Sequence, residues 1–206
     1  MSSLYLFIAA STILIITPGP DIIYVLTRGI SGGRTAGIMS AIGVTSGILV
    51  HTIAASLGLA ILLQTSPYAF WTMKIIGGIY LIYLGIKMVC KRREIVLQKA
   101  KGNFRTAECI IQGFLSNVFN PKVALFFVTF LPQFVHPSIQ NQSVYMILLG
   151  LLFALMTLIF LVILGMFAGA IASWLNKRKS VSERIAGASG VILMLLGIRL
   201  LLPQNK

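Results

Sequence analysis

The chain is a succession of six long apolar stretches separated by short polar connections. Each stretch approaches or exceeds the ~20 residues that an α-helix needs to cross the hydrocarbon core of a bilayer. The pattern therefore predicts an all-α integral membrane protein with six transmembrane helices. The predicted spans are 4–26, 36–63, 68–90, 109–135, 144–175 and 185–202.

Composition agrees with this pattern. Of the 206 residues, 57% are hydrophobic and 10% are charged, whereas soluble domains carry about a quarter charged residues. Cys90 and Cys109 lack the CxxC spacing of a metal site or a disulfide framework. The first stretch has no basic n-region and no small-residue cleavage site, so we expect it to stay in the mature protein. We predict one transmembrane domain, 1–206, with no cofactor and no metal.

The connections alternate in charge, and this alternation predicts the orientation. The 17 Lys and Arg residues lie mostly in the first, third and fifth connections, whereas the second and fourth carry no charged residue. Cytoplasmic loops are rich in Lys and Arg. We therefore place these three connections in the cytoplasm and both termini on the outer face of the bacterial inner membrane. Most aromatic residues lie inside the apolar stretches, which argues against a nucleic-acid partner despite the net charge of +13.

Two similarities divide the chain into halves. GGIYLIYLGIK at 77–87 aligns without gaps with SGVILMLLGIR at 189–199. The first and fourth stretches are also interrupted by proline, at 17–21 (TPGPD) and 120–122 (NPK). Halves of three spans each must have opposite orientations, which is the inverted-repeat plan of many secondary transporters. The predicted parts are repeat one at about 1–90, a cytoplasmic basic loop at about 91–108 and repeat two at about 109–206.

The two proline breaks form the predicted transport site. Proline has no backbone N–H and opens the hydrogen-bond ladder of a helix. Open backbone at membrane depth is tolerated where it contacts protein or lines a wet cavity, and its freed amides attract a carboxylate. A simple packing kink is the alternative for each break. The candidate substrate-binding residues are Thr17, Pro18, Gly19, Pro20, Asp21, Asn117, Asn120, Pro121 and Lys122.

Asp21 is the only acidic residue outside the basic connections. An ionisable residue inside a span is a functional hypothesis by default. It could bind a substrate ammonium, carry a coupling proton or pair with Lys122, and a helix cap near the cytoplasmic headgroups is the alternative. His51, in the second stretch, is a candidate proton relay together with Asp21, or else a hydrogen-bonded structural histidine.

Two pairs of small residues predict close contacts between helices. They are Gly43-x-x-x-Gly47 and Gly165-x-x-x-Gly169. Such motifs let helix backbones approach each other in membranes. Packing within one chain is the main interpretation, and a homo-oligomer is the weaker one.

Several motifs together resemble the lysine exporter (LysE/RhtB) family of bacterial amino-acid exporters, over essentially the whole chain. The resemblance is closest to the homoserine, threonine and leucine exporters. It implies secondary efflux of a small amino acid by proton antiport, and it places both proline breaks at the transport core. The motifs are TPGPD at 17–21, the pattern ending at His51, YLIYLGIK at 80–87, GFLSNVFNPK at 113–122 and LPQFV at 131–135.

Other classes of function have less support. A membrane-embedded enzyme would need a nucleophile with a base, a carboxylate pair or facing metal ligands, and the chain contains no HExxH pattern. A small ion or osmolyte channel is not separated from a carrier by sequence. A structural subunit would have no use for two polar breaks. We predict an exporter, not an enzyme, whose partners are an amino-acid substrate and membrane lipid.

Overall fold

The computed structural model describes residues 2–59, 67–90, 105–135, 139–177 and 179–202, and it is helical throughout, with no strand in these ranges. The predicted all-α class is therefore confirmed for them. Segments η1 and η2 are single π-helical turns, and η3 is a 3₁₀ turn. The elements are α1 (Ser2–Ile16), α2 (Pro20–Ala54), η1 (Ala55–Leu59), α4 (Pro67–Cys90), α5 (Thr106–Val118), α6 (Pro121–Leu125), η2 (Phe126–Phe130), η3 (Leu131–Phe134), α7 (Gln142–Met166), α8 (Ala168–Lys177) and α9 (Lys179–Leu201).

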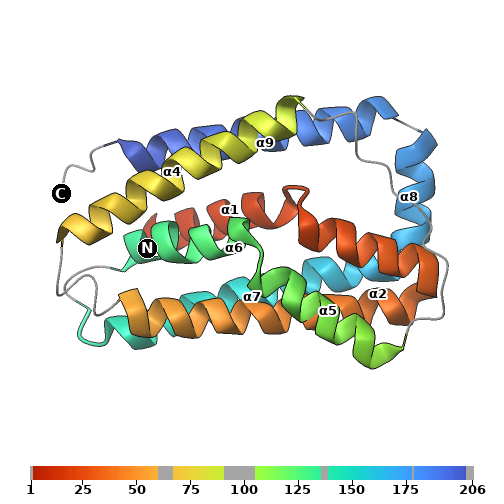
Figure 1. The fold of residues 1–206 in the computed structure, drawn as a ribbon, viewed down its shortest axis with the longest axis horizontal. Helices are drawn as coiled ribbons and strands as arrows, with labels where there is room; N and C mark the ends of the chain where they lie inside the picture. The colour runs from red at the N-terminus through yellow and green to blue at the C-terminus, as the bar shows by residue number, and fades with distance from the viewer. Residues whose placement is uncertain (1, 60–66, 91–104, 136–138, 178, 203–206) are drawn as a thin grey trace.

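Helix α2 reverses direction at Gly33. The backbone there has φ 76° and ψ −172°, a region that is open almost only to glycine. The first part of α2 lies beyond the end of α1, and the second part of α2 runs back in the opposite direction (Figure 1). The reversal is tight, because a Cβ at Gly29 would lie 3.7 Å from the Cα of Gly37. We call residues 20–32 the half-helix of α2.

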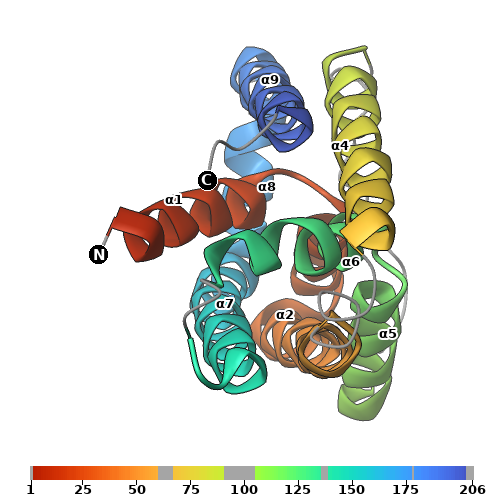
Figure 2. The ribbon, with the colours of Figure 1, turned by 90° about the vertical axis from the view of Figure 1, so that its left-hand side faces the viewer.

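Three layers make up the bundle (Figure 2). Helices α4 and α9 form one pair, helices α2, α5 and α7 form a second group, and α1 and α6 lie between them. The most extensive contacts are those of α2 with α5 and α7 and of α4 with α9. The two proline breaks, which follow α1 and precede α6, are therefore central in the molecule.

The outer faces of the helices are apolar. On α7, large hydrophobic side chains such as Leu151, Leu155 and Ile159 are exposed, whereas Phe153 and Leu161 on the opposite face are buried. Continuous exposed apolar surface of this kind marks contact with lipid or a partner. Together with a mean hydropathy of 3.1 for the most apolar 18 residues of α7, it supports a multi-pass membrane protein.

Length and composition identify fewer membrane-crossing helices than the predicted six. In the described ranges they are Pro20–Leu57 and Gln142–Met166, with a third if Thr106–Val118 and Pro121–Phe134, bent by 47°, form one span. Because α2 reverses at Gly33, its apolar run of 38 residues is two antiparallel segments. The number of spans stays a prediction.

The fifth apolar stretch is not one helix. Helix α7 ends at Met166, and α8 begins at Ala168 and turns across the end of the bundle (Figure 1). The backbone leaves helical geometry at Phe167, with φ −104° and ψ 14°. The predicted span end at residue 175 is therefore wrong. The physical reason is that the 25 residues of α7 already suffice for a bilayer, and α8 packs against α2 instead.

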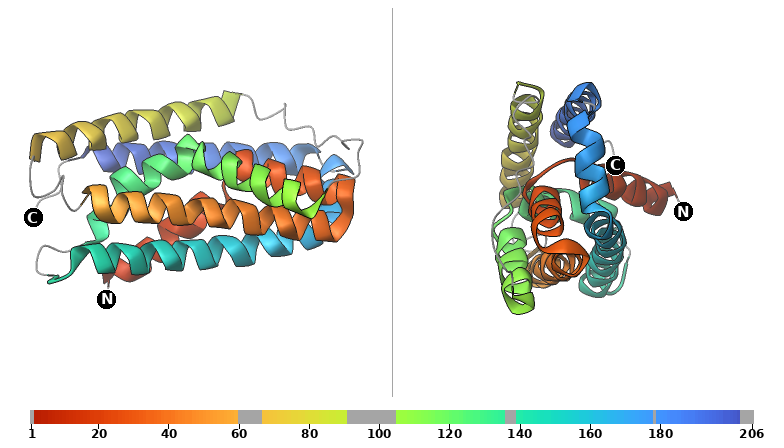
Figure 3. Two further views of the ribbon diagram at one scale, coloured as in Figure 1. Left: turned by 60° about the horizontal axis from the view of Figure 1, so that its bottom comes forward. Right: turned by 90° about the vertical axis from the view of Figure 1, so that its right-hand side faces the viewer.

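The basic segments lie at one end of the bundle. The turn of α2, the start of α5 and the junction of α8 with α9 share this end (Figure 3), and they contain Arg28, Arg34, Arg105 and Arg184. Helix α1 begins and α9 ends at the opposite end (Figure 1). Most of the predicted basic loop, at 91–104, lies outside the described residues, as do positions 64–66 and 136–138 of the uncharged connections.

Helices α4 and α9 meet at the glycines of the sequence repeat. A Cβ at Gly78 would lie 3.1 Å from the carbonyl oxygen of Gly197, and one at Gly85 would lie 2.5 Å from that of Gly190. The repeat aligns Gly78 with Gly190 and Gly85 with Gly197. The first glycine of each half therefore meets the second glycine of the other, as in a contact across a two-fold axis.

The small-residue motifs differ in what they contact. Gly43 and Gly47 pack on α5, which confirms the first predicted contact. Gly165 packs on Gly37, where a Cβ would lie 2.7 Å from the Gly165 carbonyl oxygen. Gly169 has nothing within 4 Å of an added Cβ. A homo-oligomer stays a prediction.

Alanine at Gly37 is expected to destabilise the protein by about 1–3 kcal/mol, the usual range for overpacking, because a rigid backbone would have to shift. Thermal unfolding of the purified protein in detergent measures this. Gly169→Ala is the matched control and should leave the midpoint unchanged. Equal midpoints for the two variants would contradict the close contact of α2 with α7.

Candidate functional site

Two helix breaks face each other at the centre of the bundle. Helix α1 gives way to α2 across residues 17–19, and α5 gives way to α6 across residues 119–120. Pro20 and Pro121 each occupy the first position of the following helix and are solvent- or lipid-exposed. Proline suits this position because its missing N–H would have no helical partner there.

The carboxylate of Asp21 belongs to the first break and is bound by the second. The side-chain amides of Asn117 and Asn120 both donate to Asp21 Oδ2, each at 2.9 Å. Asp21 is only 7% exposed. Its Oδ1 and the Oδ1 of Asn117 are buried without a hydrogen-bond partner among the described residues. Gly19 occupies the N-cap position of α2, so Asp21 is a buried residue of the first turn of α2 and not its N-cap.

The ammonium of Lys122 makes the reciprocal connection. Its Nζ donates to the backbone carbonyls of Leu14 at 3.1 Å and Thr17 at 3.0 Å. These carbonyls lie at the C-terminal end of α1, where the helix dipole attracts a cation. Gly19 permits the approach, since a Cβ there would lie 3.1 Å from Nζ. Lys122, 7% exposed, therefore caps α1 from the other half of the chain.

One of the three roles predicted for Asp21, direct pairing with Lys122, is not found. Within the part of the chain that the structure describes, no ion pair of 4 Å or less joins these two residues. Each charge is instead bound by polar groups of the opposite break. The carbonyls at the end of α1 bind the ammonium, and two side-chain amides bind the carboxylate. Both charged groups therefore have hydrogen-bond partners without a direct contact between them.

Asn120 connects the two charges. Its Oδ1 accepts from the backbone N–H of Lys122 at 3.0 Å and so caps α6, while its amide donates to Asp21. His51 lies beside this network, and its Nε2 donates to the backbone carbonyl of Asn117 at 3.0 Å. Because the histidine binds the main chain and not the carboxylate, a relay between His51 and Asp21 stays a prediction.

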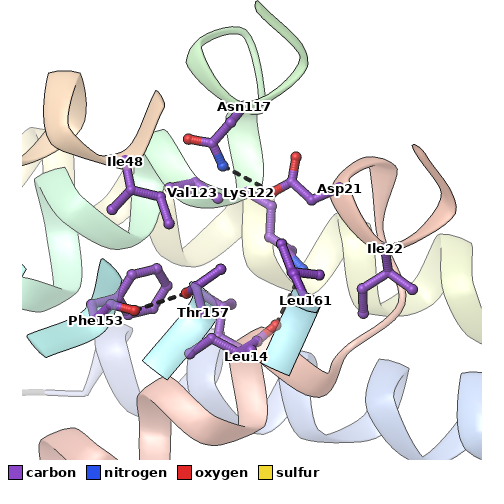
Figure 4. Close-up of a pocket in the computed structure, with 11 residues that line it drawn as sticks. Leu14, Asp21, Ile22, Ile48, Asn117, Lys122, Val123, Phe153, Thr157 and Leu161 are labelled. Carbon is purple, nitrogen blue, oxygen red and sulfur yellow. Dashed lines mark hydrogen bonds between the residues drawn. The ribbon is translucent and has the colours of Figure 1, made fainter. Parts of the chain in front are cut away.

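A small cavity, here called the central cavity, lies between the breaks and α7 (Figure 4). Its volume of about 20 Å³ is close to the ~10–15 Å³ needed for one water molecule, so it has room for little more than one water in this structure. Three of the lining residues, Asp21, Asn117 and Lys122, were predicted from the sequence motifs. The others belong to ordinary apolar runs and were not predicted. The lining residues are Leu14, Ile15, Asp21, Ile22, Ile48, Asn117, Lys122, Val123, Phe153, Thr157 and Leu161.

Contacts between α2 and α5 close the site toward the basic end. The Tyr24 hydroxyl donates to the backbone carbonyl of Cys109 at 2.8 Å. Arg28 lies over the Tyr24 ring at 5.5 Å from its centroid and 3.8 Å from a carboxylate oxygen of Glu108. Arg28 also donates to Gln112. These contacts hold the half-helix of α2 against α5.

Buried opposite charges at two facing breaks in an apolar helical bundle define a membrane protein with a polar central site. The chain belongs to the LysE type translocator family, whose model matches residues 12–204. The resemblance found from the motifs is thereby confirmed.

Similar proteins include the uncharacterized membrane protein YrhP of Bacillus subtilis, 30% identical over 97% of this chain and 98% of the relative. A leucine efflux protein of Enterobacter sp. is 28% identical over 94% and 92%. A homoserine/homoserine lactone efflux protein of Salmonella typhimurium is 27% identical over 94% and 93%. No solved structure matches the chain. Two of these three relatives are named as efflux proteins, which agrees with a family of transporters.

Proposed function

We propose that this protein exports a small amino acid across the bacterial cytoplasmic membrane by alternating access coupled to proton antiport. The observation that carries the proposal is the pair of buried charges, Asp21 and Lys122, each bound by the helix break of the other half. Intramembrane charges are costly and are retained at transport pathways. Family membership and the efflux proteins among the relatives support the same function.

The proposed architecture is one domain, 1–206, of two inverted three-span repeats. The first span combines α1 with the half-helix of α2, and the fourth combines α5 with the segments up to η3. The reciprocal glycine contacts of α4 with α9 support this two-fold relation. The basic end of the bundle faces the cytoplasm in this proposal, because Lys and Arg concentrate on that side of bacterial membranes.

An amino acid matches the chemistry of the site. Its ammonium would bind the unpartnered buried oxygens of Asp21 and Asn117, since buried acceptors without a donor are costly. Its carboxylate would bind the ammonium of Lys122, which lines the central cavity. The remaining residues of the breaks, from Thr17 to Pro20 and Pro121, shape the backbone around the substrate. Leucine and homoserine, named for the relatives, are the first substrates to test.

Substrate entry requires the halves to separate, because about 20 Å³ cannot hold an amino acid. Opening toward the cytoplasm would break the contacts of Tyr24 and Arg28 with α5. Asp21, assisted by His51, would carry the coupling proton.

The experiment is uptake into inverted membrane vesicles, where an exporter draws substrate from the medium. Labelled leucine or homoserine should accumulate with saturable kinetics when a pH gradient, acidic inside, is imposed, and vesicles without the protein should not respond. The other amino acids to test are those that appear in the culture medium when the protein is overexpressed. If none of the tested amino acids accumulates in the vesicles, the proposal is contradicted. Flux that rises linearly with concentration would favour a channel.

A further inference from the structure

Helix α7 presents one polar side chain to the central cavity. Between Met146 and Met166, Thr157 is the only residue with a polar side chain. It is 6% exposed and lines the cavity together with Phe153 and Leu161, one turn before and after it on the same face. This hydroxyl lies across the cavity from the two breaks (Figure 4).

The hydroxyl oxygen of Thr157 remains available as a hydrogen-bond acceptor. Its hydrogen is donated to the backbone carbonyl of Phe153 at 2.8 Å, and a hydroxyl oxygen keeps further acceptor capacity after donating. Such a bond to the preceding turn is common for threonine in helices. Thr52 makes the same bond to Ile48 at 2.9 Å, but it packs on Gly150 and does not line the cavity. The position of Thr157, and not its bonding alone, makes it a candidate.

The surroundings of Thr157 are apolar and firmly packed. The ring of Phe153 lies 5.0 Å from that of Phe126 and edge-on to that of Phe127 at 5.4 Å. Ile48, Val123 and Leu161 complete this side of the cavity. A charged substrate side chain would have no counter-charge here and would be excluded by its desolvation cost. A side chain with one hydrogen-bond donor would satisfy Thr157 while contacting apolar walls elsewhere.

We propose that Thr157 is a specificity-determining residue that favours small neutral amino acids carrying a side-chain hydroxyl over aliphatic amino acids of the same size. The substrate hydroxyl donates to Thr157 Oγ1, and its carbon chain packs against Phe153 and Leu161. The inference rests on the proposed transport function. It adds a contact on α7, outside both proline breaks.

The test compares homoserine with norvaline, which has a methyl group in place of the hydroxyl. Initial uptake rates of both labelled amino acids are measured in inverted vesicles at equal concentrations. The wild-type protein should prefer homoserine. Thr157→Val, which keeps the shape and removes the acceptor, should lower the homoserine-to-norvaline ratio about 3- to 10-fold, the effect of one lost hydrogen bond. If Thr157→Val does not insert into the membrane, Thr157→Ala is measured instead.

Two further variants make the result specific. Thr52→Val makes the same change at a buried threonine away from the cavity and should keep the wild-type ratio. Thr157→Ser keeps the hydroxyl and should keep the preference. An unchanged ratio in a transporting Thr157→Val variant, or a wild-type protein that carries both substrates equally, would overturn the inference. Absence of any amino-acid transport by the wild-type protein would instead overturn the proposed function.

Discussion

Replacing Lys122 by methionine is expected to reduce amino-acid efflux to background. The change keeps most of the unbranched side chain and removes the ammonium that binds the carbonyls of Leu14 and Thr17. Each buried carbonyl left without a donor costs about 1–3 kcal/mol, and the C-terminal end of α1 loses its cap. The substrate carboxylate also loses its positive partner. Efflux of labelled homoserine or leucine from preloaded cells measures the effect.

Lys87→Met is the matched control for this change. Lys87 is an exposed lysine of α4 outside both breaks, so its loss should leave efflux within about twofold of wild type, as expected for surface charges. Membrane fractions should contain similar amounts of both variants. Normal efflux by a correctly inserted Lys122→Met variant would rule out a role for Lys122 in the site.

Asp21→Asn is the second change with a large expected effect. It keeps the shape of the side chain and removes the charge that is proposed to bind the substrate ammonium and the coupling proton. Transport driven by a pH gradient should be lost. The midpoint of thermal unfolding should also fall, because the side-chain amides of Asn117 and Asn120 lose their charged acceptor, and a hydrogen bond to a charged group contributes about 1.5–3 kcal/mol.

The double variant Asp21→Asn/Lys122→Met tests whether the two charges act together in transport. It loses the hydrogen-bond partners of both charged groups, so its unfolding midpoint should lie below that of either single variant, and transport stays absent. Glu183→Gln, the same chemical change outside both breaks, should affect neither quantity strongly. Full transport by Asp21→Asn or by the double variant would contradict the proposed role of the two charges in transport.

Proline and charge made much of the site predictable from sequence. TPGPD and NPK identify positions where a helix must open, and Asp21 and Lys122 follow the two openings directly. Such breaks depend on local chemistry, because a proline removes a backbone hydrogen-bond donor at its own position whatever the fold. The all-helical class followed from apolar length in the same local way.

The partners across the site could not be predicted. Thr157 is one threonine in an apolar run, and periodicity alone cannot say which face of α7 meets the cavity. The sequence suggested a direct contact of Asp21 with Lys122, whereas amides and carbonyls of the opposite breaks bind the two charges. Choosing between these arrangements depends on how two helix ends are placed in space. The end of α7 at Met166 was missed because the apolar run continues unchanged into α8.

The cap on α1 has a consequence for biosynthesis. Lys122 follows Leu14 by 108 positions and Thr17 by 105. At a synthesis rate of about 5–20 residues per second, roughly 5–20 s pass between the translation of the carbonyls and that of their ammonium partner. During this interval the first half enters the membrane with the end of α1 uncapped and in need of a temporary donor. The candidate site is thus completed only when the second half is inserted beside the first.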